Sequence, residues 1–156
     1  MKKRTPIFLA IAILLLIAFI FYNSAQDGEE SSNASNFVTE IINGVLNFFG
    51  ITADWKSLSH LIRKGAHFSE YFALGLLTSA FIACLSRKRI YISLSPLLAF
   101  AVAVCDEFLV QGATTGRSPQ WSDVLIDLSG AITAATFVVL ALLLIARRKH
   151  KKENSK

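Results

Sequence analysis

The sequence predicts an all-α integral membrane protein, a bundle of four transmembrane helices with a short amphipathic helix in the first outer loop. Hydrophobic residues make up 53% of the 156 residues and charged residues only 17%. The apolar residues also gather in long runs, and a helix needs roughly 20 of them to cross a hydrocarbon core about 30 Å thick. A soluble domain of this size could not bury so much apolar surface. We therefore expect one membrane domain over residues 1–156.

Four runs approach the required length, and they lie at residues 6–22, 66–85, 90–110 and 124–146. The first run follows a basic start and could be a signal peptide. However, Asn23 stands where a cleavage site needs a small residue, so an uncleaved anchor is expected.

Charge is sorted between the two ends of the predicted bundle. Twelve of the sixteen Lys and Arg residues lie in the N-terminus, the loop 86–89 and the basic tail 147–156. The positive-inside rule therefore predicts that both termini are cytoplasmic. Ten of the eleven acidic residues lie on the opposite, outer side. The excess of positive charge thus reports topology and contact with membrane lipids, and no nucleic-acid partner is expected.

The first outer loop contains two kinds of sequence. Residues 23–35 are small, polar and acidic and are expected to form an exposed linker. Residues 36–49 place apolar side chains such as Phe37, Ile41 and Val45 on one helical face. This pattern predicts a short amphipathic helix lying flat on the outer leaflet. Packing of that helix against the bundle is the alternative.

Ionisable residues stand at the outer ends of three spans, on faces that continue as small residues. On a helix, Arg63, His67 and Glu70 share a side, which Gly75 and Ser79 continue. The other two spans repeat the arrangement, with Asp106, Glu107 and Gln111 on the third span and Asp123 and Asp127 on the fourth. Small-residue faces are where membrane helices pack together, so these polar groups are predicted to meet inside the bundle.

The connection between the last two spans lies above this predicted cluster. It contains two glycines and a proline, which favour turns, and it carries Arg117. Arg117 could fold back over the acidic residues or reach a phosphate outside.

Charges within a span need partners, because one charge at mid-membrane costs about 2.5–3.5 kcal/mol on insertion scales. Three explanations remain open: a binding site for a polar or anionic envelope component, a hydrolase or transferase acting on a lipid-linked substrate, and a purely structural fastener between helices. Transport is disfavoured, since the inner halves of the spans offer no polar path.

The candidate residues divide by role. The acid–base candidates are His67, Glu70, Asp106 and Glu107. The ligand-binding candidates are Arg63, Lys64, Tyr71, Gln111, Arg117, Asp123 and Asp127. The acid–base group could also bind a divalent metal through oxygen and imidazole. One histidine makes a poor zinc site, however, so no metal site or cofactor is assigned.

Two segments of the sequence resemble the VanZ-like membrane protein family. They are RKGAHFSEYFALGLL at 63–77 and CDEFLVQGATTGRSPQWSDVLIDLSGA at 105–131, and Asn23-Ser24-Ala25-Gln26 is similar to the Ser/Gln-containing piece after the family's first span. The family is named for an accessory protein associated with teicoplanin resistance in Gram-positive bacteria. The resemblance therefore implies a plasma-membrane protein of the cell envelope, with a lipid-linked cell-wall precursor or a glycopeptide as possible partner. It implies no particular reaction and no oligomeric state.

Overall fold

The computed structural model describes residues 4–86 and 88–153 of the chain. Four helical segments are long and apolar enough to cross a membrane: α1 (Arg4–Ser24), α3 (Trp55–Leu85), the composite segment Arg89–Ala113 and α5 (Trp121–Glu153). The predicted all-α, four-span fold is confirmed, and the chain is a multi-pass membrane protein. The predicted cytoplasmic residues Lys2, Lys3, Arg87 and 154–156 lie outside the described residues.

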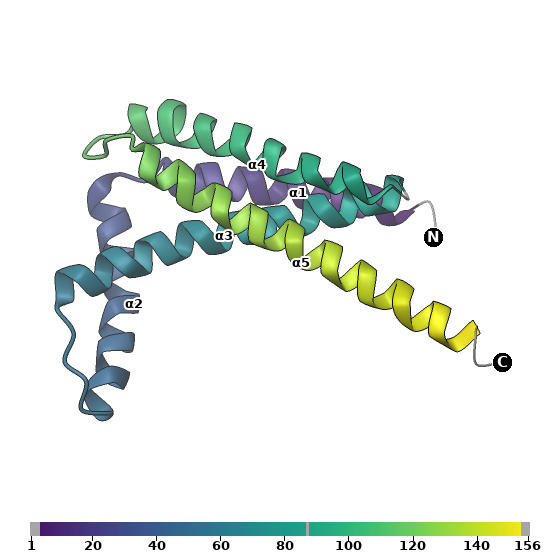
Figure 1. Cartoon of the computed structure of the whole chain (residues 1–156). Helices are drawn as coiled ribbons and strands as arrows, with labels where there is room; N and C mark the ends of the chain where they lie inside the picture. The colour runs from purple at the N-terminus through teal and green to yellow at the C-terminus, as the bar shows by residue number, and fades with distance from the viewer. Residues whose placement is uncertain (1–3, 87, 154–156) are drawn as a thin grey trace.

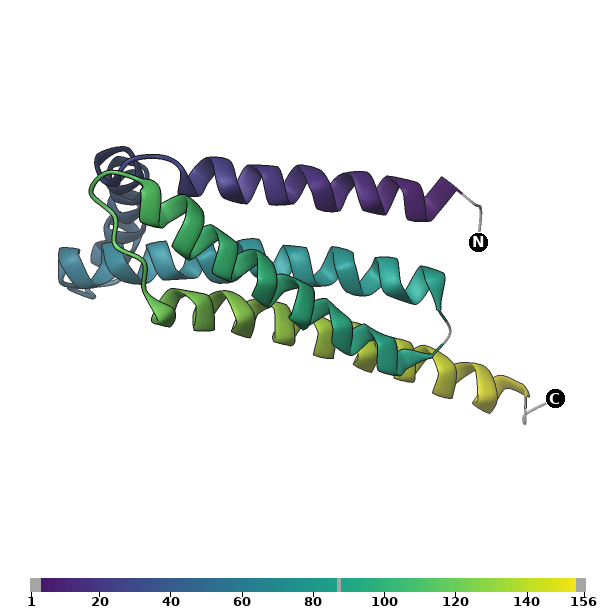
Figure 2. The same ribbon diagram turned by 90° about the horizontal axis from the view of Figure 1, so that it is seen from above.

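The four long segments run alongside one another as a bundle (Figures 1 and 2). Both termini lie at one end of it. The helix α2 (Gly28–Phe48) and the connection between the third and fourth spans lie at the other end. The described basic residues near the end of α5, such as Arg147 and Arg148, therefore lie at the opposite end of the bundle from the acidic residues of α2.

The first outer loop is more helical than the sequence indicated. α2 contains 21 residues and begins at Gly28, inside the segment 23–35 that was predicted to be a linker. Asp27 caps it, because its Oδ1 accepts hydrogen bonds from the backbone N–H groups of Glu29 (3.0 Å) and Glu30 (2.9 Å). The linker expectation is thus wrong from residue 28 onward, and the short helix over 36–49 is not confirmed. α2 runs across the bundle axis (Figure 1).

The third span is composed of four consecutive pieces. A 3₁₀ turn, η1 (Arg89–Ser93), leads into α4 (Leu94–Cys105), which is followed by a π-helical turn, η2 (Asp106–Val110), and a second 3₁₀ turn, η3 (Gln111–Ala113). A single regular helix over 90–110 was expected. Two of the three departures from α geometry, η2 and η3, fall at the polar end of the span, and η1 lies at its other end.

α3 and α5 form the tightest helix pair of the bundle. A Cβ atom added at Gly75 would lie 2.8 Å from the Cα of Ala131, and one added at Gly130 would collide with the carbonyl oxygen of Phe68. The small-residue faces predicted on these helices therefore bring the two backbones together. Farther along α3, Thr78 and Ser95 are buried and share a hydrogen bond that joins α3 to α4.

Large apolar side chains cover the outside of the bundle. Phe8, Leu14, Leu97, Leu125 and Phe137 are each at least 60% exposed. Hydrocarbon is the solvent expected around such a surface, so the bundle presents bulky apolar residues to the lipid, while its interior combines small and polar residues with a few large ones such as Tyr71, Ile20 and Leu74.

Replacement of Gly130 by Ala is expected to destabilise the bundle by about 1–3 kcal/mol, because the added methyl group cannot displace the Phe68 backbone. Thermal unfolding of the purified protein in detergent measures the effect. Gly65→Ala is the matched control, since Gly65 lies in α3 and a Cβ there meets nothing within 4 Å. Equal melting temperatures for the two variants would contradict the close approach.

Candidate functional site

The ionisable side chains predicted to meet do so at the end of the bundle opposite the termini. The polar cluster, as we name it, consists of Arg63, Lys64, His67, Glu70, Asp106, Glu107, Arg117, Asp123 and Asp127. Asp106, Glu107, Asp123 and Asp127 are at most 5% exposed. The acidic residues therefore do not point into lipid.

α3 and α5 pair their polar residues in register. Lys64 Nζ lies 2.8 Å from Asp123 Oδ1. One turn further into the bundle, His67 Nδ1 lies 3.4 Å from Asp127 Oδ1, without hydrogen-bond geometry. The first pair is partly open to solvent, and the second is almost fully enclosed. The close packing at Gly130, directly below, holds both pairs at this spacing.

The π-helical turn places two consecutive acidic residues inside the bundle. The backbone N–H of Gln111 donates to the carbonyl of Asp106, five residues back, which widens the turn. The side-chain Nε2 of Gln111 then donates to Glu107 (2.7 Å) and to Asp106 (3.2 Å). The other oxygen of Glu107 accepts a hydrogen bond from the backbone N–H of Gln120 at 2.7 Å. Glu107 thus joins the third span to the connecting loop and does not contact His67 through a hydrogen bond, so its predicted acid–base role gains no support from this geometry.

α1 contributes two polar residues that were absent from the predicted site. Asn23 Nδ2 donates to Glu70 Oε1, and the buried Ser24 Oγ donates to Asp106 Oδ2, both at 2.8 Å. Both residues are uncharged, so a search for ionisable groups missed them. The resemblance of residues 23–26 to a family motif was the available signal.

Arg117 folds back over the cluster, one of the two positions foreseen for it. Its Nη1 donates to the Ser24 carbonyl oxygen (3.3 Å) and to Gln111 Oε1 (3.1 Å). Gly116 permits this path because its φ is +77°, in the left-handed region. Burial lowers the pKa of the Arg117 guanidinium, and the nearby charge of Arg63 lowers this pKa further.

A small cavity of about 190 Å³ opens beside the cluster. Residues from three helices and the connecting loop line it, among them Asn23, Ser24, Arg63, His67, Glu70 and Arg117. It is large enough for a phosphate or carboxylate group with water. Tyr71 and Gln111 are buried behind it and shape the cluster without lining the cavity.

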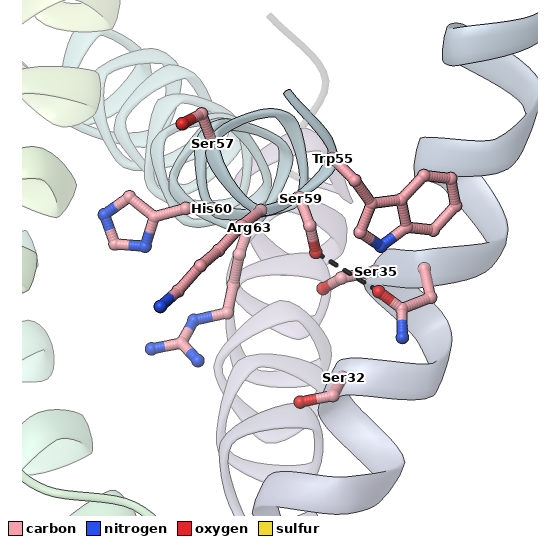
Figure 3. Close-up of a pocket in the computed structure, with 9 residues that line it drawn as sticks. Ser32, Ser35, Trp55, Ser57, Ser59, His60 and Arg63 are labelled. Atoms are coloured by element: carbon pink, nitrogen blue, oxygen red, sulfur yellow. Dashed lines mark hydrogen bonds between the residues drawn. The ribbon is translucent and has the colours of Figure 1, made fainter. Parts of the chain in front are cut away.

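A larger open groove of about 620 Å³ lies between α2 and α3 (Figure 3). Ser32 and Ser35 stand on α2, and Trp55, His60 and Arg63 extend from α3. Arg63 and Ser35 also line the small cavity, so the two spaces are adjacent. Sequence reasoning did not foresee this groove, because it depends on how α2 crosses α3.

The cluster lies within a segment that matches a protein family. A family model described as VanZ/LLP1 matches residues 8–144, which include every residue of the cluster. No curated protein and no solved structure matches the chain.

Glu107→Gln is expected to lower stability by about 1–3 kcal/mol, because an amide cannot accept from both the Gln111 side chain and the Gln120 N–H without placing its own NH₂ against a donor. Glu40→Gln, on the exposed part of α2, is the matched control and should leave the melting temperature unchanged. A Glu107→Gln protein as stable as the control would contradict a structural role for this carboxylate.

Proposed function

Because the chain belongs to the VanZ/LLP1 family and carries two unpaired arginines at a polar cavity, we propose that it binds a polar or anionic component of the cell envelope. The ligand classes are a lipid head group, a lipid-linked cell-wall precursor and a glycopeptide. The binding groups are Arg63 and Arg117, with His67 and Glu70 at the cavity wall.

The observation that carries this proposal is the lack of carboxylate partners for Arg63 and Arg117 among the described residues. In the described part of the chain, neither guanidinium forms an ion pair with a carboxylate, whereas Lys64 does. Arg63 and Arg117 line the same cavity, and the charge of Arg63 lowers the pKa of Arg117. A bound anion relieves such repulsion, and an arginine fork matches phosphate or carboxylate oxygens in two places.

The groove between α2 and α3 gives the ligand a place for more than one charged group. Its serines, asparagine and tryptophan suit a sugar or peptide head group, while Arg63 connects it to the cavity. Exposed apolar residues on α2, such as Phe37 and Ile41, lie at the same end of the molecule. An amphiphile with an acyl or prenyl chain fits this combination. We propose a link to glycopeptide (teicoplanin) resistance on the family resemblance alone.

A second candidate is a hydrolase or transferase acting on a lipid-linked substrate. His67 and Glu70 both line the cavity, and a carboxylate of Asp127 lies behind the His67 ring. That order of groups resembles a general base with an orienting acid. Glu70 is held by Asn23 and is not hydrogen-bonded to His67, so the two would act on separate atoms of a substrate.

We also propose an orientation, with both termini in the cytoplasm and the polar cluster facing the outside of a Gram-positive plasma membrane. The distribution of Lys and Arg supports it, since basic residues gather at the end where both termini lie.

Arg63→Ala is expected to weaken binding of a polyprenyl phosphate about tenfold or more, since a charge-assisted hydrogen bond contributes about 1.5–3 kcal/mol. Ligand-dependent melting in detergent measures it, with phosphatidylglycerol and teicoplanin as parallel probes. Arg148→Ala, at the other end of α5, is the matched control and should bind as the wild type does.

The results of this experiment distinguish between the three explanations of the polar cluster. No stabilisation by any of the three probes would leave it a structural fastener. Turnover of the phosphate ester by the wild type, lost in Glu70→Gln, would favour the enzyme.

Single cysteines introduced in the groove and in the basic tail are expected to label from opposite sides of intact cells. Ser57→Cys, at an exposed position in the groove, should react with an impermeant maleimide. Lys151→Cys, at an exposed position in the tail, should react only after lysis. The native cysteines, Cys84 and Cys105, are first replaced by Ala. Labelling in the reverse order would overturn the orientation.

A further inference from the structure

Three side chains of the polar cluster bring potential metal-ligand atoms close together. His67 from α3, Asp106 from the π-helical turn and Asp127 from α5 each offer an atom, and these atoms all lie within 4.8 Å of one another. Ligands about 2.1 Å from an ion lie about 3–4.2 Å apart, so a small contraction closes the set around one cation. The sequence analysis grouped His67 and Asp106 with Glu70 and Glu107 as residues that could bind a metal, and it placed Asp127 among the ligand-binding candidates.

Each of these three residues has a buried polar atom without a hydrogen-bond partner. Asp127 is 0% exposed, and neither of its carboxylate oxygens accepts a hydrogen bond. Asp106 is also 0% exposed, and its Oδ1 is unpartnered although its Oδ2 is bound by Ser24 and Gln111. Buried carboxylates are expected to be paired or to coordinate a metal.

The positive side chains nearby do not neutralise these two carboxylates. Lys64 is engaged by Asp123, and the Arg117 hydrogen bonds go to neutral oxygens. A protonated His67 would supply one positive charge for two acidic groups, and it makes no hydrogen bond to Asp127. Two negative charges and one imidazole nitrogen therefore remain, which is a ligand set for a divalent ion.

We propose that His67, Asp106 and Asp127 bind a divalent cation of the Mn²⁺ class. Carboxylate oxygens favour Mg²⁺, Ca²⁺ and Mn²⁺, whereas an imidazole ligand disfavours the first two. Zn²⁺ usually takes more nitrogen or sulfur ligands than this set provides. Because His67 also lines the small cavity, the ion would lie next to the space that Arg63 and Arg117 line. The ion binds without the proposed envelope ligand and would add to the positive charge that meets it.

The test uses full-length protein in detergent, stripped with a chelator and titrated with Mn²⁺ alone. We expect one ion per chain, a rise in melting temperature, and an imidazole nitrogen coupling in the electron spin-echo spectrum that is absent in His67→Gln. Asp127→Asn should bind at least about tenfold more weakly, since even loss of a supporting residue weakens metal binding by about 10–100-fold.

Asp123→Asn is the matched control on the same helix, and it should retain Mn²⁺ binding because Asp123 pairs with Lys64 instead. Without metal, Asp127→Asn should melt no lower than the wild type, because it removes a buried charge that accepts no hydrogen bond. This distinguishes lost coordination from lost folding.

Three outcomes would overturn the proposal: no stabilisation by Mn²⁺, equal loss in Asp127→Asn and Asp123→Asn, or stronger stabilisation by Mg²⁺ and Ca²⁺ than by Mn²⁺. Because this titration contains no envelope ligand, such a result would not affect the separate anion-binding experiment with Arg63→Ala.

Discussion

The close approach of α3 and α5 is the constraint on which the rest of the molecule depends. Gly75 and Gly130 leave no room for a side chain between the two backbones, so the helices can slide little against each other. That fixed register sets Lys64 opposite Asp123 and His67 opposite Asp127. Apolar packing in the middle of the bundle thereby positions ionisable groups at its end, where a hydrocarbon environment would otherwise oppose bringing them together.

The polar groups fall into an outer set with partners and an inner set without. Glu107, Glu70 and Asp123 each accept a strong hydrogen bond or form an ion pair, and they tie α1, α3, α5 and the connecting loop to one another. Asp127, His67 and one oxygen of Asp106 lie enclosed by that set and have unsatisfied atoms. A fastener needs only the outer set. The inner set is the reason that we propose binding chemistry for the cluster.

Much of this arrangement could be predicted from the sequence, because long apolar runs and helical spacing are both local properties. Four spans, the burial of Asp106, Glu107 and Asp127, and the small-residue face of α3 all follow from them. The helices extend beyond the apolar runs, so α3 begins at Trp55 and not near residue 66. The periodicity shows which residues lie inside hydrocarbon and gives no signal for where a helix stops in polar surroundings.

The parts that escaped prediction depend on contacts between distant segments. The π-helical turn at Asp106 shifts hydrogen bonding by one residue, which no repeat in the sequence records. Asn23 and Ser24 look like ordinary linker residues until α1 is placed beside α3 and the third span. Likewise, the sequence did not show that Arg63 would lack a carboxylate partner among the described residues. This became apparent only when the structure showed the neighbouring Lys64 in an ion pair with Asp123.

One backbone contact joins the start of α2 to the loop between the third and fourth spans. The N–H of Gly28 donates to the Thr115 carbonyl at 3.2 Å, and the Gly28 and Gly116 backbones touch so closely that no Cβ would fit at Gly28. The start of α2 is thus clamped to the same short loop that carries Arg117. A tilt of α2 would therefore shift this loop and the Arg117 guanidinium with it, so a force from the surrounding lipid on α2 would change the charge that the cavity presents.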